Sequence, residues 1–172
     1  MFKHFLRKRL YILGGLLLPC LMLSGCGTDA VISAVKSTFN LDTAKVWLEK
    51  VNIKTASDAN NNSPLQLHIL IVYKKELLAD LGKLNADTYF GKYEQIKNDN
   101  VGQVDFFVQE LVPGQNVDGF TINPSKVSGE GVLVFARYSH ELPGDHRMAV
   151  GEDKEVTIYL DKVDFRIESV KK

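Results

Sequence analysis

The sequence contains almost no cysteine, and none after position 26. Cys20 and Cys26 are the two cysteines among 172 residues. A chain with this cysteine content has no disulfide framework, so its folded part depends on a hydrophobic core. The hydrophobic content of 45% and the length are sufficient for one such core, and we expect a single folded domain.

Motifs that mark enzymes and metal sites are also missing. There is no HxxxH or CxxC spacing, no G-x-S-x-G elbow and no glycine-rich phosphate or dinucleotide loop. The carboxylates are scattered beside turn formers, which favours turn and surface roles over a catalytic pair. We therefore expect no enzymatic activity and no metal or small-molecule cofactor. His68 is predicted to be a core or sheet-edge histidine with satisfied ring nitrogens, and His140 and His146 to be exposed polar residues.

Acidic residues are absent from the first 26 positions, which hold four of the 21 basic residues. The remainder carries 17 basic and 21 acidic residues, a net charge of about −4. Nucleic-acid binding depends on clustered Lys and Arg that neutralise phosphates. The acidic remainder argues against a nucleic-acid partner.

The N-terminus has the pattern of a secretory signal. A basic stretch ending at Arg9 is followed by an apolar run, Leu10 to Leu23, of 14 residues. This run is shorter than the roughly 20 residues that a membrane-spanning helix needs, so we expect cleavage. Leu23-Ser24-Gly25-Cys26 resembles the lipobox of bacterial lipoproteins.

The lipobox resemblance implies that Cys26 becomes the lipidated N-terminus, carrying diacylglycerol and an acyl chain such as palmitate. Gly27 after it points to the outer membrane, facing the periplasm. We expect residues 1–25 to be the signal peptide, 26–44 the lipidated N-terminus and a tether of helical character, and 45–172 a β-sandwich domain.

The body of the chain is predicted to be mainly β. In KVWLEKVNIKT, which starts at Lys45, apolar residues share one side of a strand, and the turn formers SDANNNSP follow. Leu65 to Tyr73 is almost continuously apolar, which predicts a central strand covered on both faces. Further extended segments are QVDFFVQELVPG, FTINP, GEGVLVFARYSH and KEVTIYLDKVDFRIESV, the last being one long strand or a strand pair.

Lys74 to Asn100 is compatible with two short helices broken at Gly82 and Gly91. Short strands separated by turns, without alternation of strands and helices, predict an antiparallel β-sandwich with short helical inserts.

An ordered series of features connects the chain with a known family. It comprises the lipobox Cys26, the Asn60-Asn61-Asn62 turn before Ser63-Pro64, the strand ending in Val72-Tyr73, the insert with Thr88-Tyr89-Phe90 and Tyr93, the strand end Leu111-Val112-Pro113-Gly114, and the strand from Gly131 to Tyr138 before a loop that closes on Arg147. In this order they resemble TssJ (SciN), the outer-membrane lipoprotein of type VI secretion systems. The resemblance covers about Lys45 to Leu160.

The resemblance implies a transthyretin-like β-sandwich with added helices that binds the periplasmic domain of the inner-membrane TssM subunit in a multi-subunit envelope complex. It also implies that the loop between the first two strands is part of the docking surface. In this chain that loop consists of Ala56, Ser57, Asp58, Ala59, Asn60, Asn61, Asn62 and Ser63. An ordinary hairpin connection, with Asx-type turns at the asparagines, accounts for the same residues equally well.

Two other functions fit the same observations. One is a structural lipoprotein of another envelope machine, such as a type IV secretion outer-membrane core, because one fold serves many partners. The other is a periplasmic binder of small ligands, which needs an apolar pocket with converging polar groups.

Overall fold

The computed structural model describes residues 48–139, 142 and 144–170. The signal peptide, Cys26, the tether and His140 lie outside this part, and their predictions stay predictions. The elements in chain order are β1 (Lys50–Thr55), α2 (Ala59–Asn62), β2 (Leu65–Val72), α3 (Lys75–Leu81), α4 (Ala86–Gly91), α5 (Tyr93–Asp99), β3 (Val104–Leu111), β4 (Asn116–Thr121), β5 (Gly131–Ala136), β6 (Arg147–Val150), β7 (Glu155–Leu160) and β8 (Phe165–Ser169).

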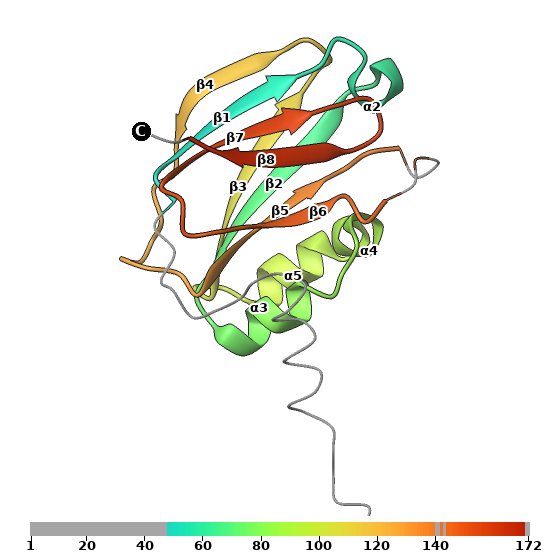
Figure 1. Cartoon of the computed structure of the whole chain (residues 1–172). Helices are drawn as coiled ribbons and strands as arrows, with labels where there is room; N and C mark the ends of the chain where they lie inside the picture. The colour runs from blue at the N-terminus through green and yellow to red at the C-terminus, as the bar shows by residue number, and fades with distance from the viewer. Residues whose placement is uncertain (1–47, 140–141, 143, 171–172) are drawn as a thin grey trace, which may run out of the picture.

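The strands form two sheets that pack face to face (Figure 1). The first sheet has the order β4-β1-β7-β8, and the second has the order β3-β2-β5-β6. All pairs are antiparallel except β1 with β7, which run parallel from Lys50 opposite Glu155 to Thr55 opposite Leu160. The predicted β-sandwich is confirmed, with one parallel pair that the sequence pattern did not indicate.

The main core fills the space between the sheets. Val51 and Ile53 of β1 are fully buried, as their predicted common side requires, and the buried alternate residues of the neighbouring strand β7 lie beside them in the same sheet. Before β1 the alternation is interrupted, because the N–H groups of Glu49 and Lys50 both donate to the carbonyl of Lys154. Such a local bulge lets Leu48, which is 2% exposed, enter the core.

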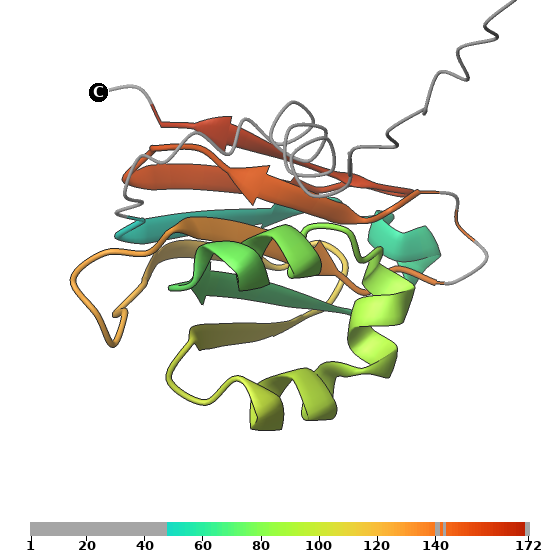
Figure 2. The ribbon, with the colours of Figure 1, turned by 90° about the horizontal axis from the view of Figure 1, so that it is seen from below.

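Strand β2 is the centre of the second sheet, as predicted, and is covered on both faces. Its residues Leu67 and Ile69 face the main core, while Leu70 and Val72 contribute to a second cluster beneath the helices. All three helices α3, α4 and α5 cover this outer face (Figure 2). The insert therefore belongs to the packed fold and buries its own apolar surface.

The insert contains three short helices instead of the predicted two. The predicted break at Gly91 is present, because α4 ends at Gly91, and the backbone of Lys92, at φ −113° and ψ 6°, separates α4 from the additional helix α5. Asn85 begins α4, because its side chain accepts a hydrogen bond of 2.9 Å from the Thr88 N–H. Glycine in the last position of α4 weakens helix continuation at this point.

The strands give the sandwich two distinct ends. The described chain begins at one end, here called the near end, where β4 leads into β5 and β6 leads into β7 (Figure 1). The opposite end, the far end, holds the connections 56–64, 112–115 and 161–164, together with residues 137–139 and 144–146. None of the helices in the described part is long and apolar enough to cross a membrane.

Candidate docking site

The connection from β1 to β2 crosses from one sheet to the other. Strand β1 pairs with β4 and β7, whereas β2 pairs with β3 and β5, so these consecutive strands are not hydrogen-bonded to each other. The alternative of an ordinary hairpin connection is therefore wrong. The crossing loop, residues 56–63, lies at the far end and contains α2 (Figure 1).

Three consecutive asparagines give this loop its shape. Asn60, Asn61 and Asn62 have φ values of 48°, 51° and 63°, which make a left-handed turn. Asparagine tolerates this region better than other residues with a side chain, because its amide forms local hydrogen bonds. A run of three such residues stores backbone strain, which proteins retain mainly at functional positions.

The eight predicted docking residues divide into two groups. Ala59 and Asn60 are buried, and Ala56 is half-buried. The other five point to solvent, and they are Ser57, Asp58, Asn61, Asn62 and Ser63. The exposed group is available to a partner, and the buried group shapes the loop.

Asn60 fastens the loop to two other parts of the far end. Its Nδ2 donates to the carbonyl of Pro64 at 2.9 Å, and its Oδ1 accepts from the N–H of Ser139 at 2.7 Å. The backbone N–H groups of Asn60 and Asn61 donate to the carbonyls of Asp161 and Lys162 in the turn between β7 and β8. These hydrogen bonds hold the loop against the β7–β8 turn and Ser139.

Tyr138 fixes the same β7–β8 turn from the other side. Its hydroxyl lies 3.1 Å from the carbonyl oxygen of Asp161 and 2.7 Å from that of Asp164. Burial, followed by the nearby carboxylates of Asp164 and Asp161, raises the pKa of Tyr138, so the hydroxyl remains a donor.

His146 was predicted to be an exposed polar residue, and this prediction is wrong. The residue is 6% exposed, its ring stacks on Tyr138 at 4.6 Å, and Nε2 lies 3.0 Å from the carbonyl oxygen of Val163. The carbonyl comes from the β7–β8 turn, 17 residues further along the chain, and periodicity does not predict this contact.

A further turn supports the loop on its other side. The N–H of Gly114 donates to the carbonyl of Ala56 at 3.0 Å, and the N–H of Thr55 donates to the carbonyl of Gln115 at 3.2 Å. Gly114 has a φ of 80°, a conformation that glycine adopts without strain. The Pro113-Gly114 dipeptide is a sequence signal for this turn, but it does not indicate which loop the turn contacts.

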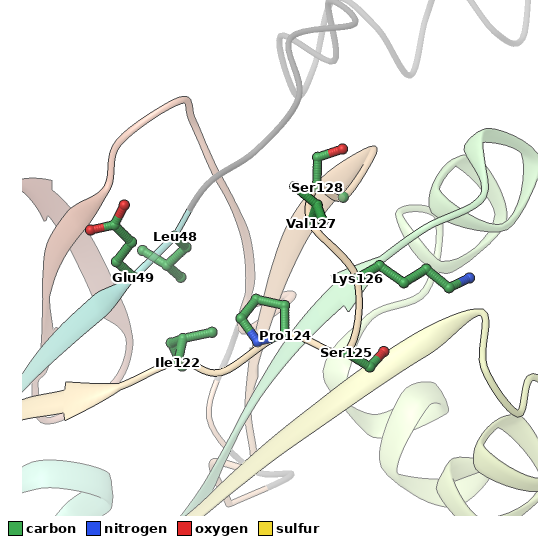
Figure 3. A pocket seen from close by; sticks show the side chains of 9 residues that line it. Leu48, Glu49, Ile122, Pro124, Ser125, Lys126, Val127 and Ser128 are labelled. Carbon is green, nitrogen blue, oxygen red and sulfur yellow. The ribbon is translucent and has the colours of Figure 1, made fainter.

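The surface also has hollows, and their polar groups are engaged elsewhere. A hollow of about 330 Å³ at the near end lies between Leu48, Pro124 and Val127 (Figure 3). Around it, the Ser125 hydroxyl donates to Asp105 and the Lys126 ammonium donates to the carbonyl of Gly102. Because these groups bond to the protein, they do not converge on the hollow as a ligand site requires.

A second hollow, of about 530 Å³, lies beside the loop. Three of its polar side chains are paired with one another: Arg137 donates to Gln66 at 3.3 Å, and Gln66 donates to Glu110. Within the described residues, no three His, Cys, Asp or Glu side chains are grouped so that they could hold a metal ion.

Comparison with known proteins identifies the class of fold. No family model matches the sequence, and no curated protein matches it. Solved structures do match. The type VI secretion lipoprotein TssJ1 from Pseudomonas aeruginosa has 14% sequence identity and a TM-score of 0.56, with 76% of this chain and 99% of that chain covered.

Two further structures are similar at the same level. Lip of Serratia marcescens, a membrane-bound component of the type VI secretion system, has 13% identity and a TM-score of 0.55 over 70% of this chain and 96% of its own. A chain of a type VI membrane complex has 12% identity and a TM-score of 0.55 over 70% and 98%. The predicted resemblance is thus confirmed for the fold: this chain has the β-sandwich fold that these type VI secretion lipoproteins share.

Proposed function

We propose that the protein is a non-enzymatic outer-membrane lipoprotein of a type VI secretion membrane complex. In this function, lipid on Cys26 holds the chain on the periplasmic face of the membrane. The loop of residues 56–63 binds the periplasmic domain of the inner-membrane TssM subunit. The fold shared with type VI secretion lipoproteins carries the proposal.

The separation of the two ends supports this assignment. The described chain begins at the near end, and the loop lies at the far end. Strands β1, β2 and β3 run between the two ends and have 6 to 8 residues each. This number of residues corresponds to a strand length of about 20 to 26 Å. A tether before Leu48 and a partner on the loop would therefore meet the sandwich at opposite ends.

The form of the loop also supports protein binding. Six of its eight backbone N–H groups donate within the protein, so a partner meets a largely preformed surface of exposed side chains. A preformed surface loses little conformational entropy on binding, which favours affinity.

The proposal is tested by affinity purification of the tagged protein from detergent-solubilised envelopes, with partners identified by mass spectrometry. We expect a TssM-like inner-membrane subunit to be recovered. The test variant combines Asp58→Ser with Asn61→Gly and Asn62→Gly, which removes exposed side chains and keeps the left-handed turn accessible. It should lose the partner.

The control variant is Glu152→Ser, an exposed change at the near end, and it should retain the partner. Deletion of the whole turn is a poorer test, because it removes buried Asn60 together with the exposed residues. Recovery of a type IV secretion core instead would keep the anchoring role and contradict the type VI assignment. Retention of TssM by the triple variant would place the interface outside the loop.

A further inference from the structure

The hollow at the near end has an apolar lining that the described residues leave open. Leu48 and Ile122 lie on one side of it and Val127 on the other, with Pro124 between them (Figure 3). Val127 is 81% exposed. With a volume of about 330 Å³, the hollow has room for roughly ten water molecules. Water against apolar walls is unfavourable, so an apolar side chain that displaces it stabilises the protein.

The connection of residues 123–130 forms one wall of the hollow and is held at its base. Ser125 donates to Asp105 of β3 through both its N–H and its hydroxyl. The ammonium of Lys126 donates to the carbonyl of Gly102 at 2.7 Å. These contacts keep the next residue, Val127, at the rim. The wall is therefore preformed, and a side chain that packs against it costs little entropy in ordering the loop.

The chain enters the domain beside this hollow. The N–H of Ile122 donates to the Glu49 carbonyl at 2.9 Å, which keeps the start of the described chain next to the stretch that leads to Pro124. The regular pairing of β1 begins at Lys50. The alternation of a strand therefore does not set the direction of the side chains that precede Leu48.

We propose that Trp47 closes the hollow by packing its indole ring on Pro124 and Val127. Trp47 directly precedes Leu48 and is the single tryptophan of the sequence. A tryptophan buries roughly 150 to 250 Å² of surface, and at an open rim its N–H reaches solvent. Because it is joined to the wall of the hollow by one peptide bond, its effective concentration there exceeds that of a separate partner or a second copy. The inference is independent of the proposed function and assigns the near end to the chain's own tether.

The single tryptophan supplies the readout. Emission wavelength and acrylamide quenching of the mature lipidated protein in detergent report on Trp47 alone. Val127→Asp places a charge at the rim of the hollow, and we expect it to shift the emission to longer wavelength and to increase quenching. Val127→Leu keeps the rim apolar and should leave both unchanged. The matched control is Val101→Asp, because Val101 is also 81% exposed but does not line the hollow. It too should leave both unchanged.

Three results would overturn the proposal. One is the emission of a fully exposed indole in the unmodified protein. Another is an equal response, or none, in the two aspartate variants, which would mean that detergent or another part of the chain covers Trp47. The third is shielding that depends on protein concentration, which would assign the hollow to a second copy. Circular dichroism checks that each variant is folded, as expected for replacements of exposed valines.

Discussion

His68 lies in an aromatic environment beneath the helical insert. It is 2% exposed, its Nδ1 lies 2.9 Å from the Tyr89 hydroxyl, and the rings of Phe90 and Tyr93 are each 4.7 Å from its own. Burial lowers the pKa of His68 from 6.5 to about 4, Glu110 opposes this change and Arg137 adds to it. The prediction of a core histidine is confirmed.

This pKa predicts a loss of stability in mild acid. The unfolded chain takes up the proton near pH 6.5 and the folded chain only near pH 4, so the stability contribution is complete above pH 6.5 and is lost as the pH falls toward 4. The expected loss is about 3 kcal/mol. Urea denaturation across this range should show a shallower pH dependence for His68→Phe. If the free energy of unfolding depends on pH equally in the wild-type protein and in His68→Phe, the loss of stability in acid does not come from His68. The lost hydrogen bond to Tyr89 does not explain a difference, since its cost is the same at every pH.

Asn60 and Asn61 share a backbone conformation but differ in burial, which makes them a matched pair. Asn60→Ala leaves the N–H of Ser139 and the carbonyl of Pro64 without their side-chain partner. It should lower the free energy of unfolding by about 2 to 4 kcal/mol. Asn61→Ala should cost about 1 kcal/mol, from the positive φ alone. Denaturant unfolding measures both, and equal losses would mean that the two hydrogen bonds of Asn60 do not stabilise the loop.

At the scale of elements, the helical insert and the sheet meet without room for an added methyl group. A Cβ at Gly131, the first residue of β5, would lie 2.5 Å from Cδ2 of Leu78 on α3. Leu78 is 3% exposed, so its side chain has no solvent into which it can move. The glycine therefore sets the distance between α3 and the sheet.

We expect Gly131→Ala to displace α3 and to destabilise the protein by about 1 to 3 kcal/mol. Hydrogen exchange should become faster in α3, and denaturation should give the stability change. Gly91→Ala is the control, because a Cβ at Gly91 meets nothing within 4 Å. An unchanged exchange rate in α3 would show that the contact relaxes without moving the helix.

The elements that the sequence predicts well are those with long apolar patterns. The β2 strand has eight residues and is mostly apolar, and the last predicted segment is the β7–β8 pair. The β6 strand was missed, because Arg147–Val150 has four residues and no measurable alternation. The parallel pairing of β1 with β7 joins segments about a hundred residues apart, and periodicity does not specify a pairing partner.

In the candidate site, too, local residue types were predictive and contacts between distant residues were not. The asparagine turn was predicted from its residue types, since asparagine favours turns. Which asparagine is buried was not predictable, because it depends on the Ser139 N–H, 79 positions further along the chain. The supporting residues Tyr138 and His146 were missed as site residues for the same reason.

At the scale of the whole molecule, the described core begins at Leu48, well after the predicted lipidation site. We predict that Cys26→Ser leaves the domain folded and releases it from the outer membrane, because acyl chains contribute about 0.8 kcal/mol per buried methylene to membrane attachment. Membrane fractionation and circular dichroism check the two parts. A variant that stays in the outer membrane and supports full secretion would contradict anchoring through Cys26.

The position of β1 determines how force would pass through the molecule. This one strand leads from the start of the described chain at the near end directly into the loop at the far end. Tension between a tether before Leu48 and a partner on the loop would therefore pass along the covalent backbone of β1, and the hydrogen bonds of β1 to β4 and β7 would share the load. An extended strand is already close to its full length of about 3.3 to 3.6 Å per residue. Such a link would be stiff, and the rest of the sandwich would keep the loop in shape.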